Sequence, residues 1–188
     1  MLYTRKGDSG TTKTFGCDQR MSKSSAVAEA LGTLDELNSY LGLIRADMRG
    51  RAAFQVPAGK RSRGAEQVVH DVQQVLFTVQ AEVAGAQKKV SKAKVATLET
   101  ITDSIEKTIP PITSFSLAGG TYLSALFDVA RTIARRAERR VVAVHDEGLQ
   151  RVGTHTLAYL NRLSSLMFAL ARYANHIDEV TEEPPSYR

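Results

Sequence analysis

Residues 120–147 read GTYLSALFDVARTIARRAERRVVAVHDE and carry the longest helical pattern in this sequence. Small and apolar side chains recur there at steps of three and four residues, at Leu123, Leu126, Ala130, Ile133, Ala137, Val141 and Val144. That spacing places them along one stripe of an α-helix, and Gly148 supplies a stop. A long helix with an apolar stripe is stable only when other helices cover that stripe, so this stretch favours a helical bundle.

Four other segments carry the same periodicity and are expected to be the partners of this helix. They are centred on residues 26–48, 68–83, 95–105 and 153–177. Pro110 and Pro111 end the third of the five helices, and a polar, glycine-bearing loop is expected at residues 49–64. No segment alternates convincingly in the manner of a strand. The sequence therefore predicts an all-α fold, a five-helix antiparallel bundle.

The composition is that of one ordinary folded domain. The chain has 188 residues, of which 43% are hydrophobic and 24% charged, with a formal net charge of +5. A chain of this length buries about 70% of the surface that it exposes when unfolded. Cys17 has no partner cysteine, no signal peptide is recognised, and no apolar run approaches the roughly 20 residues of a membrane span. We therefore expect a cytoplasmic protein.

Within one domain over residues 1–188, we expect three parts. Residues 1–23 form an N-terminal loop, residues 24–178 the helical bundle, and residues 179–188 a flexible tail that includes Pro184 and Pro185.

The N-terminal loop has the composition of a phosphate-binding segment. Residues 4–14 read TRKGDSGTTKT, a stretch of hydroxyls, cations and glycines with nothing to bury. Glycines let backbone N–H groups converge on an anion, and Arg5, Lys6 and Lys13 offset its charge. The alternative is a mobile N-terminus. A P-loop is excluded, because Thr12 replaces a required glycine and the rest of the chain is helical.

The long helix carries a polar face beside its apolar stripe. Arg131, Arg135, Glu138 and Arg139 stand at i, i+4, i+7 and i+8, and so share that face. Arginines can clamp phosphate oxygens, and a carboxylate beside them can hold Mg²⁺. The alternatives are a salt-bridged solvent face or an interface between subunits. Asp35 could pair with an arginine of a neighbouring helix or chain.

Two further features concern ligands. The loop Phe115–Gly120 could present Phe115 or Leu117 to a large apolar ligand, or tuck into the end of the bundle. The four histidines have no metal-ligand spacing, so metal binding by histidine is not expected.

Several motifs, taken together and in order, resemble the PduO-type ATP:cob(I)alamin adenosyltransferases. They are YTRKGDSGTT at residues 3–12, GTLDELNS at 32–39, ARTIARRAER at 130–139 and YLNRLS at 159–164. The chain departs from the family pattern at Ala118, where proline is usual, and at Ser165, where aspartate is usual.

The resemblance implies a homotrimeric five-helix bundle with active sites between subunits. The reaction would be transfer of the 5′-deoxyadenosyl group of ATP to the cobalt of cob(I)alamin, with release of triphosphate. The substrates would be ATP and cobalamin, with Mg²⁺ as cofactor, a reductase supplying the reduced corrinoid and an adenosylcobalamin-dependent enzyme accepting the product.

The resemblance also implies roles for individual residues. The nucleotide contacts would be Thr4, Arg5, Lys6, Gly7, Thr12, Lys13, Lys23, Arg135, Arg136, Glu138, Arg139 and Asn161. Glu138 would also coordinate Mg²⁺. Phe115 and Leu117 would bind cobalamin, and Asp35 and Arg131 would pair across the subunit boundary. Arg135, Phe115, Asp35 and Arg131 would be the residues on which catalysis depends.

Two other classes of function stay open at this point. An ATP-binding regulatory trimer would bind the nucleotide without releasing triphosphate, and a cobalamin carrier would bind corrinoid without needing the arginine face. Nucleic-acid binding is a distant third, because the basic residues lack interleaved aromatics or a recognised motif.

Overall fold

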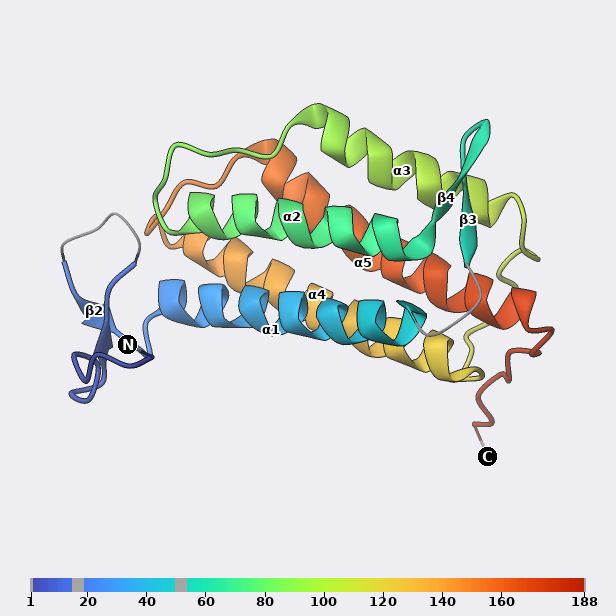
Figure 1. Cartoon of the computed structure of the whole chain (residues 1–188), viewed down its shortest axis with the longest axis horizontal. Helices are drawn as coiled ribbons and strands as arrows, with labels where there is room; N and C mark the ends of the chain where they lie inside the picture. Colours follow the sequence, from blue (N-terminus) through green and yellow to red (C-terminus); the bar gives the residue numbers. More distant parts are fainter. Residues whose placement is uncertain (1, 15–18, 50–53, 188) are drawn as a thin grey trace.

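The computed structural model of this chain describes residues 2–14, 19–49 and 54–187. Its five helices are α1 (Ala26–Arg49), α2 (Ala65–Val83), α3 (Lys92–Glu106), α4 (Tyr122–Asp146) and α5 (Thr154–Ile177). They run side by side along the long axis of the molecule, and α4 packs against both α1 and α5 (Figure 1). The prediction of five helices is confirmed.

The prediction of a purely helical chain is wrong in one respect, because two small antiparallel hairpins are present. One joins β1 (Thr11–Thr12) to β2 (Met21–Ser22), and the other joins β3 (Gln55–Ala58) to β4 (Arg61–Gly64). The second hairpin lies in the segment expected to be a loop. Val56 is its one fully buried apolar side chain, so no alternating pattern marks these strands in the sequence.

The core lies where the apolar stripes of the helices meet. On α4 the predicted stripe is buried, and Ala130, Ala134 and Ala137 have no solvent exposure. Larger leucines of the neighbouring helices α1 and α5, among them Leu37 and Leu163, are also fully buried in the same core. Burying one such leucine stabilises the fold by about 1.5–3 kcal/mol, so the stripes outweigh the modest helix propensity of the valines in α2.

A buried carboxylate joins the end of α2 to the start of α5. Glu82 is 2% exposed, and its Oε1 accepts a hydrogen bond from the backbone N–H of Gly153 at 2.7 Å. Its Oε2 accepts one from the hydroxyl of Thr156 at 2.5 Å. Gly153 is the N-cap residue of α5 and has no side chain to form a cap, and Glu82 ties its N–H to the Thr156 hydroxyl in the first turn of the helix.

Within the part of the chain that the structure describes, no helix combines the length and the apolar character needed to cross a membrane.

We predict that Glu82→Ala lowers the free energy of unfolding by about 2 kcal/mol or more, because two donors at the start of α5 lose their buried acceptor. Urea denaturation followed by far-UV circular dichroism measures this. Glu106→Ala, at an exposed glutamate of α3, is the control and should change stability by less than about 0.5 kcal/mol. Equal stability of the two variants would show that Glu82 does not hold α5.

Candidate functional site

The described residues of the N-terminal segment, 2–14 and 19–25, include successive turns around Gly7. The backbone N–H of Gly10 donates to the carbonyl of Gly7 at 3.1 Å, and that of Lys23 donates to the carbonyl of Gly10 at 2.9 Å. The ammonium of Lys23 lies so close that a Cβ on Gly7 would stand 3.1 Å from it. The structure therefore brings Gly7 and Lys23, two predicted phosphate-binding residues, together.

The remaining predicted residues of this segment are accessible. Thr4, Arg5, Lys6 and Lys13 are exposed, and Thr12 is half-buried in β1. Arg5 adopts a positive φ of 59° and its guanidinium lies 5.4 Å from the centre of the Tyr3 ring. These cations and hydroxyls lie on the surface of the segment, where an anionic ligand can reach them.

Arg20 is a residue that sequence reasoning missed. Its Nε donates to the Thr11 hydroxyl at 2.7 Å, and its Nη2 donates to the carbonyls of Thr11, at 2.8 Å, and of Lys6. One guanidinium thus ties β1 to the turn that contains Lys6. The sequence offered only a cation nine residues beyond Thr11, and the bonds depend on the hairpin that brings the two together.

On the polar face of α4, some side chains have hydrogen-bond partners within the chain and the Arg135 side chain has none recorded among the described residues. Glu138 is half-buried, and its Oε1 accepts a hydrogen bond from the side-chain amide of Asn161 on α5 at 3.0 Å. Arg139 is exposed and donates to the carbonyl of Arg135 at 3.1 Å. The exposed guanidinium of Arg135 has no recorded partner within the described residues. Arg135, Glu138, Arg139 and Asn161 therefore form one accessible polar cluster, which we call the α4 face.

Three other predicted residues are placed differently. Arg136 forms an ion pair with Glu36 of α1. Arg131 pairs with Asp128 at 3.2 Å within the same helix, and its guanidinium lies over the ring of Phe168 at 5.8 Å. Asp35 is exposed on α1, and no hydrogen bond or ion pair of its side chain is recorded within the described ranges.

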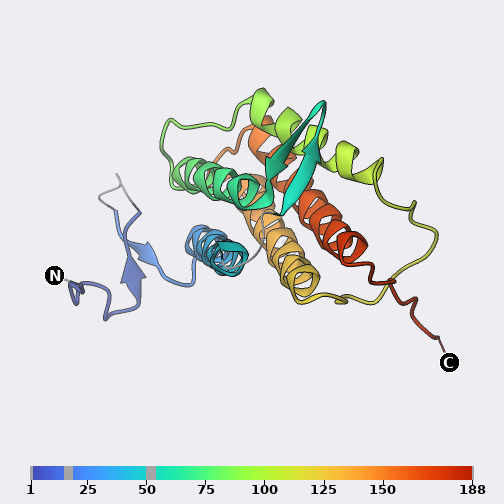
Figure 2. The ribbon, with the colours of Figure 1, turned by 45° about the vertical axis from the view of Figure 1, so that its right-hand side comes forward.

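The N-terminal segment and the α4 face lie apart within one chain. Figures 1 and 2 both show the N-terminal hairpin standing off the bundle beside the start of α1, away from α4. Across the described ranges, no recorded hydrogen bond or ion pair joins this segment to α4. The two predicted halves of the nucleotide site are therefore separate surfaces of the chain.

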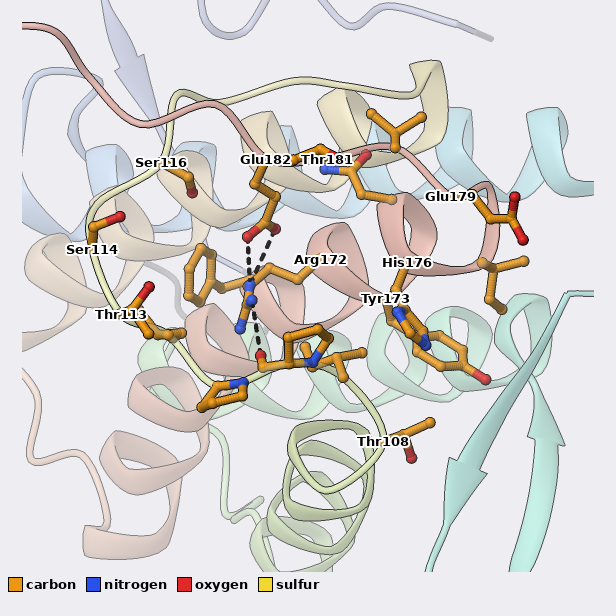
Figure 3. A pocket seen from close by; sticks show the side chains of 18 of the residues that line it. Thr108, Thr113, Ser114, Ser116, Arg172, Tyr173, His176, Glu179, Thr181 and Glu182 are labelled. Atoms are coloured by element: carbon orange, nitrogen blue, oxygen red, sulfur yellow. Dashed lines mark hydrogen bonds and ion pairs between the residues drawn. The ribbon is translucent and has the colours of Figure 1, made fainter.

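A cavity of about 830 Å³ opens at the other end of the molecule. It lies between residues 108–116, the end of α5 and residues 179–182, and Phe115 is part of its lining (Figure 3). Phe115 is 80% exposed, so its ring is free to meet a ligand. Leu117 borders a smaller neighbouring cavity instead. The cavity beside Phe115 has both apolar and polar lining residues, among them Ile109, Ile112 and Arg172.

The loop that carries Phe115 is fixed at its end by glycine geometry. Gly119 and Gly120 have positive φ angles of 119° and 105°. A Cβ on Gly120 would stand 2.5 Å from Oδ1 of Asn175, whose side chain bonds the Gly119 carbonyl and the Thr121 N–H at 3.0 Å each. Only glycine fits at residue 120, so the double glycine sets the direction in which the loop enters α4.

The segment expected to be a flexible tail makes several contacts with this loop. Both carboxylate oxygens of Glu182 accept from Nε of Arg172, at 3.1 and 3.0 Å, and Arg172 also donates to the carbonyl of Pro110 at 3.1 Å (Figure 3). The backbone N–H of Leu117 donates to the carbonyl of Glu183 at 2.8 Å. Residues 182 and 183 are thus attached to the cavity wall.

The carboxylate of Glu138 suits a magnesium ion that is shared with a phosphate ligand. Mg²⁺ keeps waters and binds through one or two carboxylates plus substrate phosphates. Asn161 engages one Glu138 oxygen, and among the described residues no group of three or more His, Cys, Asp or Glu side chains lies together. The donor set fits a metal held jointly with a bound triphosphate, and it does not fit a cage made by the protein alone.

The chain is a five-helix bundle with a cationic N-terminal segment, an arginine-rich helix face and a large cavity, which are surfaces suited to an anionic ligand and to a larger one. The model of the cobalamin adenosyltransferase family matches residues 2–174, and the chain belongs to that family.

Similar proteins carry consistent names. The corrinoid adenosyltransferase of Bacillus subtilis is 38% identical over 178 residues, which cover 93% of this chain and 86% of that protein. The corrinoid adenosyltransferase PduO of Citrobacter freundii is 39% identical over 183 residues, and the match spans 93% of this chain but only half of that longer protein.

Solved structures agree with this assignment. A variant of the PduO-type ATP:corrinoid adenosyltransferase from Lactobacillus reuteri, complexed with cobalamin and ATP, superposes with a TM-score of 0.85 at 29% identity. That match covers 100% of this chain and 97% of the other. Another variant of the same enzyme, complexed with ATP, gives a TM-score of 0.83 at 28% identity over 98% of this chain and 100% of the other.

We predict that Arg20→Ala speeds amide hydrogen exchange in residues 6–12, because the turns of the N-terminal segment lose the guanidinium that ties them together. Hydrogen-exchange mass spectrometry of the free protein measures this. Lys60→Ala, in the exposed turn between β3 and β4, is the control and should leave that exchange unchanged. Unaltered exchange in Arg20→Ala would show that the hairpin alone fixes these turns.

Proposed function

We propose that this chain transfers the 5′-deoxyadenosyl group of ATP to the cobalt of cob(I)alamin, giving adenosylcobalamin and triphosphate. The observation that carries this proposal is the full-length match to an enzyme solved with cobalamin and ATP together. The chain's own residues support it, because one chain offers a cationic N-terminal segment, an arginine-rich helix face and a cavity beside Phe115.

The reaction needs no protein nucleophile. The reduced cobalt supplies the electron pair of the new Co–C5′ bond. The C5′–O5′ bond of ATP breaks, and its electron pair leaves on the triphosphate. Catalysis by the protein then consists of positioning the two substrates and stabilising the charge that develops on the leaving group.

The α4 face is suited to that leaving group. Arg135 is exposed, and Arg139 and Glu138 lie on the same side of the helix. Arg135 would stabilise the triphosphate as its charge develops, and Glu138 would hold Mg²⁺ together with the phosphates. When bound, Mg²⁺ would neutralise part of the triphosphate charge. Asn161 would keep Glu138 in place through the 3.0 Å hydrogen bond.

The N-terminal segment would bind the phosphate chain of the same nucleotide. Thr4, Arg5, Lys6, Gly7, Thr12, Lys13 and Lys23 are its proposed contacts. In a single chain this segment stands away from α4, so a complete site requires the segment of one subunit to meet the α4 face of another (Figure 2). A homotrimer meets this requirement, because a cyclic arrangement repeats the same contact at each boundary.

The proposed trimer also assigns roles to charged residues at the subunit boundary. Asp35 on α1 is exposed and would pair with Arg131 across the boundary, which requires Arg131 to exchange its Asp128 contact. Arg136, which the sequence assigned to ATP, is held by Glu36 and would contribute to ATP binding only if that ion pair opened. We therefore place Arg135 and Arg139 ahead of Arg136 as nucleotide contacts.

The cavity beside Phe115 would take the corrin ring. Phe115 would lie against the corrin face and help exclude the lower axial base from the cobalt, and Leu117, on the same loop beside the neighbouring cavity, would extend the contact with cobalamin. An apolar wedge that keeps the base away makes the cobalt easier to reduce, as the choice of axial ligand tunes the potential of other metal macrocycles. A reductase would supply the electron, and an adenosylcobalamin-dependent enzyme would consume the product.

The direct test is anaerobic incubation of the protein with ATP, Mg²⁺ and chemically reduced cobalamin, with identification of both products. Adenosylcobalamin and triphosphate in equal amounts are the expected result. ATP binding without triphosphate release would favour a regulatory trimer, and tight corrinoid binding without ATP binding would favour a cobalamin carrier.

We predict that Arg135→Ala lowers kcat by about tenfold or more, because the leaving triphosphate loses a positioned charge. Steady-state kinetics under anaerobic conditions measure this. Arg140→Ala is the matched control, since Arg140 lies on the same helix but pairs with Glu29 of α1 at 3.5 Å, and its kcat should stay within about twofold. Wild-type turnover in Arg135→Ala would contradict the proposed role of the α4 face.

A further inference from the structure

A chain of hydrogen bonds crosses three helices and ends at the α4 face. Asn161 Nδ2 donates to Glu138 Oε1 at 3.0 Å, and Arg162 Nη1 donates to Asn161 Oδ1 at 2.6 Å. Arg162 Nε then donates to Glu99 Oε1 of α3 at 3.1 Å. Neither Arg162 nor Glu99 is among the proposed nucleotide contacts.

The two neighbours of Asn161 fix the orientation of its amide. An ionised glutamate only accepts hydrogen bonds, and an arginine only donates them. Glu138 therefore requires the amide nitrogen on its side, and Arg162 requires the amide oxygen on the other. The reverse orientation would place oxygen against carboxylate and nitrogen against guanidinium. Asn161 consequently presents a defined edge, with its second N–H, to a ligand on the α4 face.

Glu99 holds the Arg162 side chain in the position from which it donates to Asn161. Arg162 has a long side chain that is 46% exposed, and without a partner it would sample many rotamers in solvent. Ser165, on the same groove as Glu99 and Arg162, carries no charge, so the partner comes from α3. An ion pair this exposed contributes little to stability, so its main effect is to place the Arg162 side chain.

We propose that Arg162 and Glu99 are positioning residues for the nucleotide, which act by holding Asn161 and, through it, Glu138. The inference rests on the proposed function of the α4 face. Glu99 lies on a different helix from Glu138 and touches no predicted nucleotide contact directly. Its effect on ATP therefore has to pass through Arg162 and Asn161.

The test compares Glu99→Ala with Glu99→Gln. Glutamine keeps an oxygen that accepts from Arg162, whereas alanine removes it. We expect Glu99→Ala to raise the KM for ATP about three- to tenfold, by analogy with the loss of outer-shell partners at other sites. Glu99→Gln should stay within about twofold of wild type, because the bond is retained. The KM for cobalamin and the thermal midpoint should not change in either variant.

Glu29→Ala is the matched control. Glu29 is 50% exposed and forms the surface ion pair with Arg140, against 43% exposed for Glu99, but it has no bond to Asn161. It should leave the KM for ATP unchanged. A wild-type KM for ATP in Glu99→Ala, or equal effects of Glu99→Ala and Glu29→Ala, would overturn the inference.

Calorimetric titration with ATP and Mg²⁺ separates this inference from the proposed function. If the wild-type protein binds ATP but transfers nothing, the proposed function fails, and the Kd of Glu99→Ala still tests the positioning role. Transfer by the wild type with an unchanged Kd and KM in Glu99→Ala leaves the function intact and contradicts the positioning role. Absence of ATP binding by the wild type contradicts both.

Discussion

The structure depends on the close contact of α4 with α1 and α5 through a stripe of alanines. Ala130, Ala134 and Ala137 are fully buried, and such small side chains allow the neighbouring helices to approach α4 closely. Because the helix repeat is fixed, burying this stripe also fixes where every other side chain of α4 points. Glu138 meets α5, Arg136 and Arg140 meet α1, and Arg135 faces solvent.

The fixed orientation of the α4 side chains explains how a helical bundle can present a site for a nucleotide. Helices are rigid supports, and side chains on a packed helix lose little further entropy on binding. The α4 face gains a second support from α5 through Asn161, and α5 in turn is anchored at its start by Glu82. The described residues of the N-terminal segment are held by Arg20 and by their own turns. The two halves of the proposed site therefore differ in how they are stabilised.

The sequence predicted what periodicity and local composition determine. The five helices follow from the apolar stripes, and the position of Arg135, Glu138 and Arg139 on one face follows from their spacing. The hairpin of β3 and β4 could not be predicted from the sequence. Each strand has four residues, Val56 is the one buried residue among them, and apolar and polar side chains do not alternate. The strands of the N-terminal segment, two residues each, are shorter still.

Long-range partners also lie beyond what the sequence reveals. Arg136 adjoins Arg135 and shares its chemistry, yet the structure pairs it with Glu36, one hundred residues away. The same limit applies to Arg20 and to Glu99, whose importance depends on which element lies opposite. The family resemblance suggested the motif residues, but the connections that hold them in place required the three-dimensional structure.

The central claim is that one nucleotide site needs the N-terminal segment of one chain and the α4 face of another, and subunit complementation tests it most directly. Lys23→Ala and Arg135→Ala proteins, each defective alone, are mixed, unfolded and refolded together, and then assayed for adenosyl transfer. In a randomly mixed trimer about a quarter of the boundaries combine an intact segment with an intact face, so we predict recovery of about a quarter of wild-type activity. Activity no greater than the average of the two variants refolded separately would contradict the claim and place both halves of the site in one chain.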